Sequence, residues 1–209
     1  MAFSNDIQIM KFQCPKCKRE FKLEKRVIIS QIRHPYEVEG ILEGWYFDFT
    51  CPHCETQFTI DFPMIYYDEL SKCIILSTGK DQEVFKHFVE TFEEDDTTVN
   101  DAFKNRYTGC KAFRLVQSNE ELIEKMRIKN DQLDDRVIEY IKYDITNEMK
   151  KHFSLDVEFL YKSKSNDELL YEADTDKGLI VSHVALTAYK KAADLMKIEF
   201  VNEIGRAHV

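Results

Sequence analysis

The chain has 209 residues, of which 44% are hydrophobic and only ten are Gly or Pro, so it is a globular rather than a disordered protein, with one domain or one small module joined to another. Its formal net charge of −9 argues against binding nucleic acid or an acidic membrane over its whole surface. No apolar run reaches the length of a membrane span, and the start MAFSNDIQIM lacks the apolar region of a secretory signal, so we expect a cytoplasmic protein without membrane contact.

The first eighty residues fit a small β-sheet with one helical turn. Strand-like sequence covers residues 21–31, and His34-Pro35 then breaks the pattern. Residues 36–42 fit a short helical turn that ends near Gly44. Aromatic alternation and apolar runs predict the remaining strands, at 45–50, 56–62, 64–67 and 72–78.

Two Cys-Pro-x-Cys motifs interrupt this region. Each places two thiols on a tight turn, because the proline fixes φ at the second position. The 33 residues between them, 18–50, exceed the usual inner spacing of a four-cysteine zinc site. The two motifs nevertheless share the proline and the spacing of their cysteines, and strand-like sequence flanks both, which favours a shared metal site. We predict one structural Zn²⁺ with four thiolate ligands and no open coordination position. The expected ligands are Cys14, Cys17, Cys51 and Cys54.

Other interpretations of these cysteines are two disulfides, ordinary buried thiols or a redox pair. A reducing cytoplasm favours metal over disulfides. A thioredoxin-like motif opens a helix, whereas strand-like FKLEKRVIIS and TQFTIDF follow the two motifs here. The remaining cysteines have no close partner: Cys73 lies in the apolar run CIILS and fits a small core residue, and Cys110 stands alone.

Residues 81–152 are expected to continue the first region, mainly with helices. Aromatic residues at 85–92 stand at helical spacing. Ser118 and Glu121 form a capping box, which predicts that a helix begins there. Two further elements follow from local patterns, a strand at 112–116 and an amphipathic helix at 133–149.

Residues 153–203 fit a β-meander followed by a helix. Turn-forming residues stand at 165–167 and 176–178, between alternating apolar segments. The predicted strands are 157–161, 169–173 and 179–181, and the predicted helix starts near 186. The predicted fold class is therefore α+β, with an N-terminal zinc-ribbon-like small antiparallel sheet (1–80), helices (81–152) and this C-terminal meander plus helix.

The last six residues, 204–209, match the translation of the start of a widely used short-read sequencing adapter. We expect this segment to be an adapter-derived tail and exclude it from functional reasoning, as for a fusion scar. His208 is therefore not a candidate ligand.

Charge is unevenly distributed, since residues 1–34 carry a net +5 and residues 35–60 carry no Lys or Arg. A basic stretch is usually a solvated face, but it is also the chain's candidate footprint for a polyanion. Phe12 and Phe21 are the candidate stacking faces for a nucleic acid in this alternative. Its cations are Lys16, Lys18, Arg19, Lys22, Lys25 and Arg26.

The two motifs and their surroundings resemble the CpXC family of prokaryotic proteins, whose members carry two Cys-Pro-x-Cys motifs around a long insert. His34-Pro35, the segment FPMIYYDE after the second motif and residues 114–142 are also similar to the family pattern, and the resemblance covers residues 11–145. The family is functionally uncharacterised, so the resemblance implies a bacterial metal-binding protein without implying an activity. Many zinc knuckles have glycine after the second cysteine, where Lys18 and Glu55 stand here.

The leading hypothesis is a non-enzymatic protein whose zinc ribbon stabilises a sheet that binds another macromolecule, most simply another protein. The first alternative is the nucleic-acid-binding or regulatory module described above. The second is an enzyme with its site in the C-terminal half, although the sequence has no P-loop, nucleophile elbow, dinucleotide fingerprint or HExxH motif. The sequence does not indicate the oligomeric state.

Overall fold

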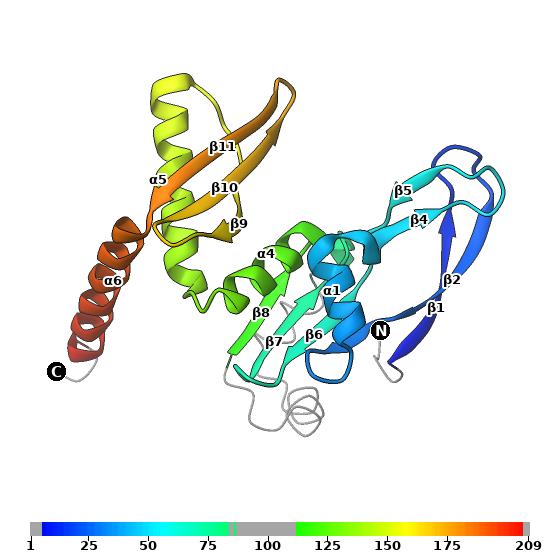
Figure 1. The fold of residues 1–209 in the computed structure, drawn as a ribbon, viewed down its shortest axis with the longest axis horizontal. Coiled ribbons are helices and arrows are strands. Elements are labelled where there is room, and N and C mark those ends of the chain that lie inside the picture. Colours follow the sequence, from blue (N-terminus) through cyan, green and yellow to red (C-terminus); the bar gives the residue numbers. More distant parts are fainter. Residues whose placement is uncertain (1–5, 84–85, 87–111, 207–209) are drawn as a thin grey trace. The chain divides into compact units, whose positions relative to one another are not determined.

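The computed structural model describes residues 6–83, 86 and 112–206, with side chains described as far as residue 196. These residues fall into two compact units, Met1–Ile123 and Glu124–Val209, and the division lies inside a helix (Figure 1). Apart from residue 86, the helix expected at 85–92 lies outside the described residues, as does Cys110. No helix among the described residues is both long enough and apolar enough to cross a membrane.

Two antiparallel hairpins form the outer part of the first unit (Figure 1). One pairs β1 (Ile7–Gln13) with β2 (Glu20–Arg26), and the other pairs β4 (Asp48–Thr50) with β5 (Gln57–Thr59). The Phe21 ring lies 6.3 Å from the Phe12 ring of its own hairpin and 6.0 Å from the Phe58 ring of the other, centroid to centroid. This aromatic contact joins the two hairpins.

A four-stranded mixed sheet forms the core of the first unit, in the order β3-β6-β7-β8. Its strands are β3 (Ile28–Ser30), β6 (Met64–Asp68), β7 (Cys73–Ser77) and β8 (Ala112–Val116). The central pair, β6 and β7, is antiparallel, whereas β3 and β8 pair in parallel at the two edges. All five residues of β7 are buried, which confirms Cys73 as a core residue.

The segment between the two hairpins contains α1 (Pro35–Glu43) and the 3₁₀ turn η1 (Trp45–Phe47). The helix begins with Pro35, whose fixed φ suits the first helical turn, and ends at Gly44, whose φ of 90° is left-handed. The strand expected at 45–50 therefore begins only at Asp48, because the turn η1 takes its first three residues. Gly40 and Ile41 form the buried part of α1.

The strand expected at 21–31 is divided at Val27 into β2 and β3. The physical reason is a change of partner, since β2 pairs with β1 and β3 pairs with β6. At the break, the Val27 amide donates to the Asp6 carbonyl and the Val27 carbonyl accepts from the Ile65 amide.

The helix α4 (Asn119–Asn130) begins at the predicted capping box. The Glu121 amide donates to Ser118 Oγ at 3.2 Å, and the Glu121 carboxylate accepts from the Gln117 amide at 2.7 Å. Asp61 supports the same helix start, because its Oδ1 accepts from the Asn119 amide at 2.8 Å. The first turn of α4 is thus anchored to the first unit by side chains that satisfy free helical amides.

The second unit packs α5 (Asp135–Phe153) and α6 (Leu186–Arg206) with an antiparallel sheet of order β11-β10-β9. The strands are β9 (Leu160–Lys164), β10 (Glu168–Thr175) and β11 (Gly178–Ala185), which form the expected meander, although the first strand begins at Leu160 rather than at residue 157. Its fully buried aromatic residues are Phe159, Tyr161 and Tyr171. The observed fold class is α+β, as predicted.

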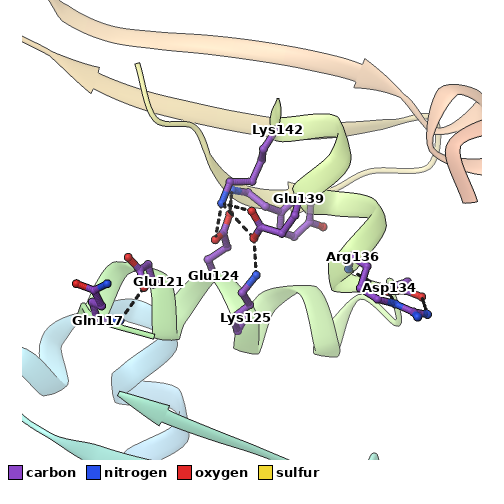
Figure 2. Close-up of polar contacts among 9 residues, drawn as sticks. Gln117, Glu121, Glu124, Lys125, Asp134, Arg136, Glu139 and Lys142 are labelled. Carbon is purple, nitrogen blue, oxygen red and sulfur yellow. Dashed lines mark hydrogen bonds and ion pairs between the residues drawn. The ribbon is translucent and has the colours of Figure 1, made fainter. Parts of the chain in front are cut away.

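A buried charge network lies among α4, α5 and β9 of this unit (Figure 2). Glu124 is 1% exposed, and its two carboxylate oxygens accept from Lys142 Nζ at 3.0 Å and from the Tyr161 amide at 2.7 Å. Glu139 also contacts Lys142 and pairs with Lys125. Burial alone would lower the pKa of Lys142, but the carboxylates of Glu124 and Glu139 outweigh it and raise that pKa.

Candidate metal centre

The two cysteine pairs occupy the turns of the two hairpins, with Cys14 and Cys17 between β1 and β2 and Cys51 and Cys54 between β4 and β5. In the first turn, the Cys14 amide donates to the Arg19 carbonyl and the Lys18 amide donates to the Cys14 carbonyl, each at 3.0 Å.

The second turn repeats this pattern. The Cys51 amide donates to the Thr56 carbonyl at 2.9 Å, and the Glu55 amide donates to the Cys51 carbonyl at 3.0 Å. The residue after the second cysteine is left-handed in both turns, with φ of 61° at Lys18 and 57° at Glu55. The positive φ that zinc knuckles usually give to glycine is therefore kept here by residues with side chains.

The four sulfur atoms converge. The Cys14 and Cys54 Sγ atoms are 3.7 Å apart, as are those of Cys17 and Cys51, and all four lie within 4.8 Å of one another. Four sulfurs at ~2.3 Å from a tetrahedral Zn²⁺ are ~3.8 Å apart. None of these cysteines forms a disulfide, so the donor set and its spacing fit a metal ion.

Three of the sulfurs have hydrogen-bond partners nearby, but the thiol pKa values do not all fall, because burial and the neighbouring cysteines raise the pKa of Cys17 to about 11. The Cys17 amide donates to Cys14 Sγ and the His53 amide donates to Cys51 Sγ, each at 3.4 Å. The Thr56 hydroxyl lies 3.3 Å from Cys54 Sγ and lowers the pKa of that thiol to about 6. A lowered thiol pKa favours metal binding, because thiolates rather than thiols are the ligands.

His53 and Glu55 lie beside the sulfurs without joining them. The His53 ring is directed at the other hairpin, with Nε2 3.3 Å from the Glu20 carbonyl oxygen. Within the described residues, the groups close enough to hold this metal are the four cysteines alone. Four thiolates fill a tetrahedral ion, so this arrangement suits a structural site.

The sequence that forms this cysteine cluster matches a known protein family. The family described as "CpXC protein" matches residues 12–142, which is more than half of the chain. The chain belongs to the CpXC family. Both Cys-Pro-x-Cys motifs lie inside the matched range, as do α1, the mixed sheet, the whole of α4 and the first part of α5. No curated protein and no solved structure matches the chain.

The structure uses two of the six cations considered for nucleic acid within the CpXC protein itself. Lys25 Nζ donates to the Tyr46 carbonyl at 3.1 Å and lies 4.3 Å from the Tyr46 ring centroid and 4.8 Å from that of Phe49. Burial lowers the pKa of Lys25. Arg26 pairs with Glu37 at 3.1 Å.

The other four cations, Lys16, Lys18, Arg19 and Lys22, are exposed. Of the two candidate stacking rings, Phe21 is buried at the contact between the two hairpins and Phe12 is partly covered. The candidate nucleic-acid surface therefore retains exposed positive charge at the first cysteine turn, but the Phe21 ring is not accessible for stacking on a base. Sequence reasoning missed the Lys25 site because its ring partners lie on η1 and β4, more than twenty residues further along the chain and beyond any local pattern.

Proposed function

We propose that this CpXC-family protein binds one structural Zn²⁺ through its four clustered cysteines and uses the resulting zinc ribbon to hold a surface that binds another protein in the bacterial cytoplasm. The observation that carries the proposal is the convergence of Cys14, Cys17, Cys51 and Cys54 within 4.8 Å from two hairpin turns of the same geometry. A saturated four-thiolate ion has no position for substrate, so we propose no enzymatic role.

Elemental analysis tests the metal. Protein purified without added metal is expected to contain one zinc per chain, and Cys51→Ser is expected to lose it. Cys73→Ala is the matched control, because Cys73 is a buried thiol outside the cluster and its replacement should leave the zinc content unchanged. Cobalt substitution should give the absorption of a tetrahedral four-sulfur site. A zinc content near zero or paired disulfides would refute the zinc site.

A second candidate is a nucleic-acid module, favoured by the four exposed cations at the first turn and on β2. It predicts retention on heparin that falls steeply with salt and is lost when Lys16, Lys18, Arg19 and Lys22 are replaced by Gln. Retention that is insensitive to these replacements removes this candidate and leaves a protein partner.

A further inference from the structure

An exposed aromatic pair is formed by Tyr36 on α1 and Trp45 on the following turn η1. Tyr36 is 68% exposed and Trp45 is 38% exposed, although both are large aromatic residues. Their ring centroids are 5.0 Å apart, with an angle of 52° between the planes. Large aromatic side chains that remain in solvent together are typical of interaction surfaces, where they supply contact area at low entropic cost.

Gly40 fixes the position of this pair. A Cβ atom built at Gly40 would lie 2.6 Å from the nearest atom of the Trp45 ring, so the ring rests directly on the helix backbone. Tyr36 stands one helical turn before Gly40, and its ring contacts the Trp45 ring. The pair is therefore held in place before any partner binds, which lowers the entropic cost of binding.

The same helical face carries unpaired negative charge. Glu39 and Glu43 follow Tyr36 by three and seven residues and so lie on its side of α1. Both are exposed, and neither has an ion-pair partner within the part of the chain that the structure describes. Glu37 differs, because it is paired with Arg26. Residues 35–60 contain no Lys or Arg, so nothing in this segment offsets the charge.

We propose that Tyr36, Trp45, Glu39 and Glu43 form a docking surface for an arginine-bearing segment of the partner protein. A guanidinium stacks on aromatic faces and donates in a fork to carboxylates, and this surface offers both groups side by side. The negative charge disfavours nucleic acid and acidic membranes as occupants. The inference rests on the proposed binding of a protein partner and names where that partner docks.

Trp45 provides the measurement, because it is the single tryptophan of the chain. The zinc-loaded protein is titrated with acetylated hexa-arginine at low salt, with hexa-lysine and hexa-glutamate in parallel. Hexa-arginine is expected to change the Trp45 emission, to bind several-fold more tightly than hexa-lysine and to weaken as salt rises. Hexa-glutamate is expected to leave the emission unchanged.

Matched variants separate this surface from the general acidity of the chain. Glu39→Gln with Glu43→Gln is expected to weaken hexa-arginine binding roughly fivefold or more. Glu20→Gln with Glu24→Gln makes the same charge change on β2 and should have little effect. Tyr36→Leu should weaken binding, whereas Tyr36→Phe should retain it because the ring remains.

Equal effects of the two glutamine pairs, or full binding by Tyr36→Leu, would overturn the proposed surface. Circular dichroism and zinc content of each variant are measured on the same samples. A protein that loads zinc and still fails to bind hexa-arginine refutes this surface alone, whereas a protein that loads no zinc refutes the structural site on which the proposed function depends.

Discussion

Lys18 and Glu55 each adopt a backbone conformation that residues with a Cβ atom disfavour, and each does so immediately after a candidate metal ligand. The left-handed region costs a non-glycine residue about 1–2 kcal/mol. Each cysteine turn combines this conformation with the same pair of backbone hydrogen bonds. The turns therefore contain strain, which the packing of the hairpins and a bound metal would offset.

This strain predicts that Lys18→Gly stabilises the zinc-loaded protein by about 0.5–1 kcal/mol, because relief of strain exceeds the larger entropy that glycine has in the unfolded chain. Urea denaturation of the first unit measures the change. Lys16→Gly is the control, since Lys16 has no positive φ and the same replacement should destabilise. Equal losses in both variants would show that the turn is not strained.

At the scale of single elements, the Trp45 ring lies against α1 at Gly40, in the space that a side chain at position 40 would occupy. Gly40→Ala would ordinarily stabilise a helix by about 0.5–1 kcal/mol. Here the new Cβ displaces the Trp45 ring, which lies at the end of a side chain and can swing into solvent. We therefore expect a small change in stability and a clear shift of the Trp45 emission to longer wavelength.

The matched control for this variant is Glu39→Ala, which changes the neighbouring position of α1 without adding an atom near the ring. Its emission should resemble that of the unmodified protein. An unshifted spectrum for Gly40→Ala would contradict the contact between Trp45 and the helix backbone.

The charge network that joins α4, α5 and β9 makes a second prediction at this scale. Glu124→Gln keeps an acceptor for the Tyr161 amide but removes the buried charge that faces Lys142. We expect it to destabilise the second unit by about 2 kcal/mol, since Glu139 still contacts Lys142. Glu139→Gln should cost about 0.5 kcal/mol, because this side chain is 47% exposed. Similar costs for the two variants would contradict the network.

The elements differ in how well the sequence predicts them. The capping box at Ser118, the periodic apolar residues of α5 and the three strands of the meander follow local rules, and all appear in the structure. The break at Val27 and the parallel pairing of β3 with β6 were not predicted. Strand partners are chosen by contacts between distant segments, and a continuous apolar stretch does not encode such contacts.

The candidate metal site and its surroundings also differ in how well the sequence predicts them. Cysteine spacing and the repeated proline predict the four sulfurs that converge in the structure. The aromatic surroundings of Lys25 and the exposed Tyr36–Trp45 pair depend on how separate segments pack. The sequence therefore places Lys25 and Arg26 in the candidate footprint for nucleic acid, whereas the fold engages both side chains in contacts within the protein.

At the scale of the whole molecule, the two units depend on different interactions. The cysteines belong to the first unit, whereas the core of α5, α6 and the meander contains apolar residues of the second unit only. A strong chelator should therefore remove amide-exchange protection from β1, β2, β4 and β5, because two-stranded hairpins are marginal alone. Strands β9 to β11 and helix α5 should keep theirs. Uniform loss of protection, or unchanged protection of the hairpins, would contradict this division.

The two cysteine turns are far apart along the chain, so an ion that binds both of them reduces the conformational entropy of the unfolded chain. An ion bound to both turns acts as a cross-link that closes a loop of 33 residues, 18–50. By the chain-entropy relation for cross-links, closing such a loop disfavours the unfolded chain by about 4 kcal/mol. Helix α1 lies inside this loop, although none of its side chains is a candidate ligand. A bound ion would therefore disfavour the unfolded state of the same chain segment that carries Tyr36 and Trp45.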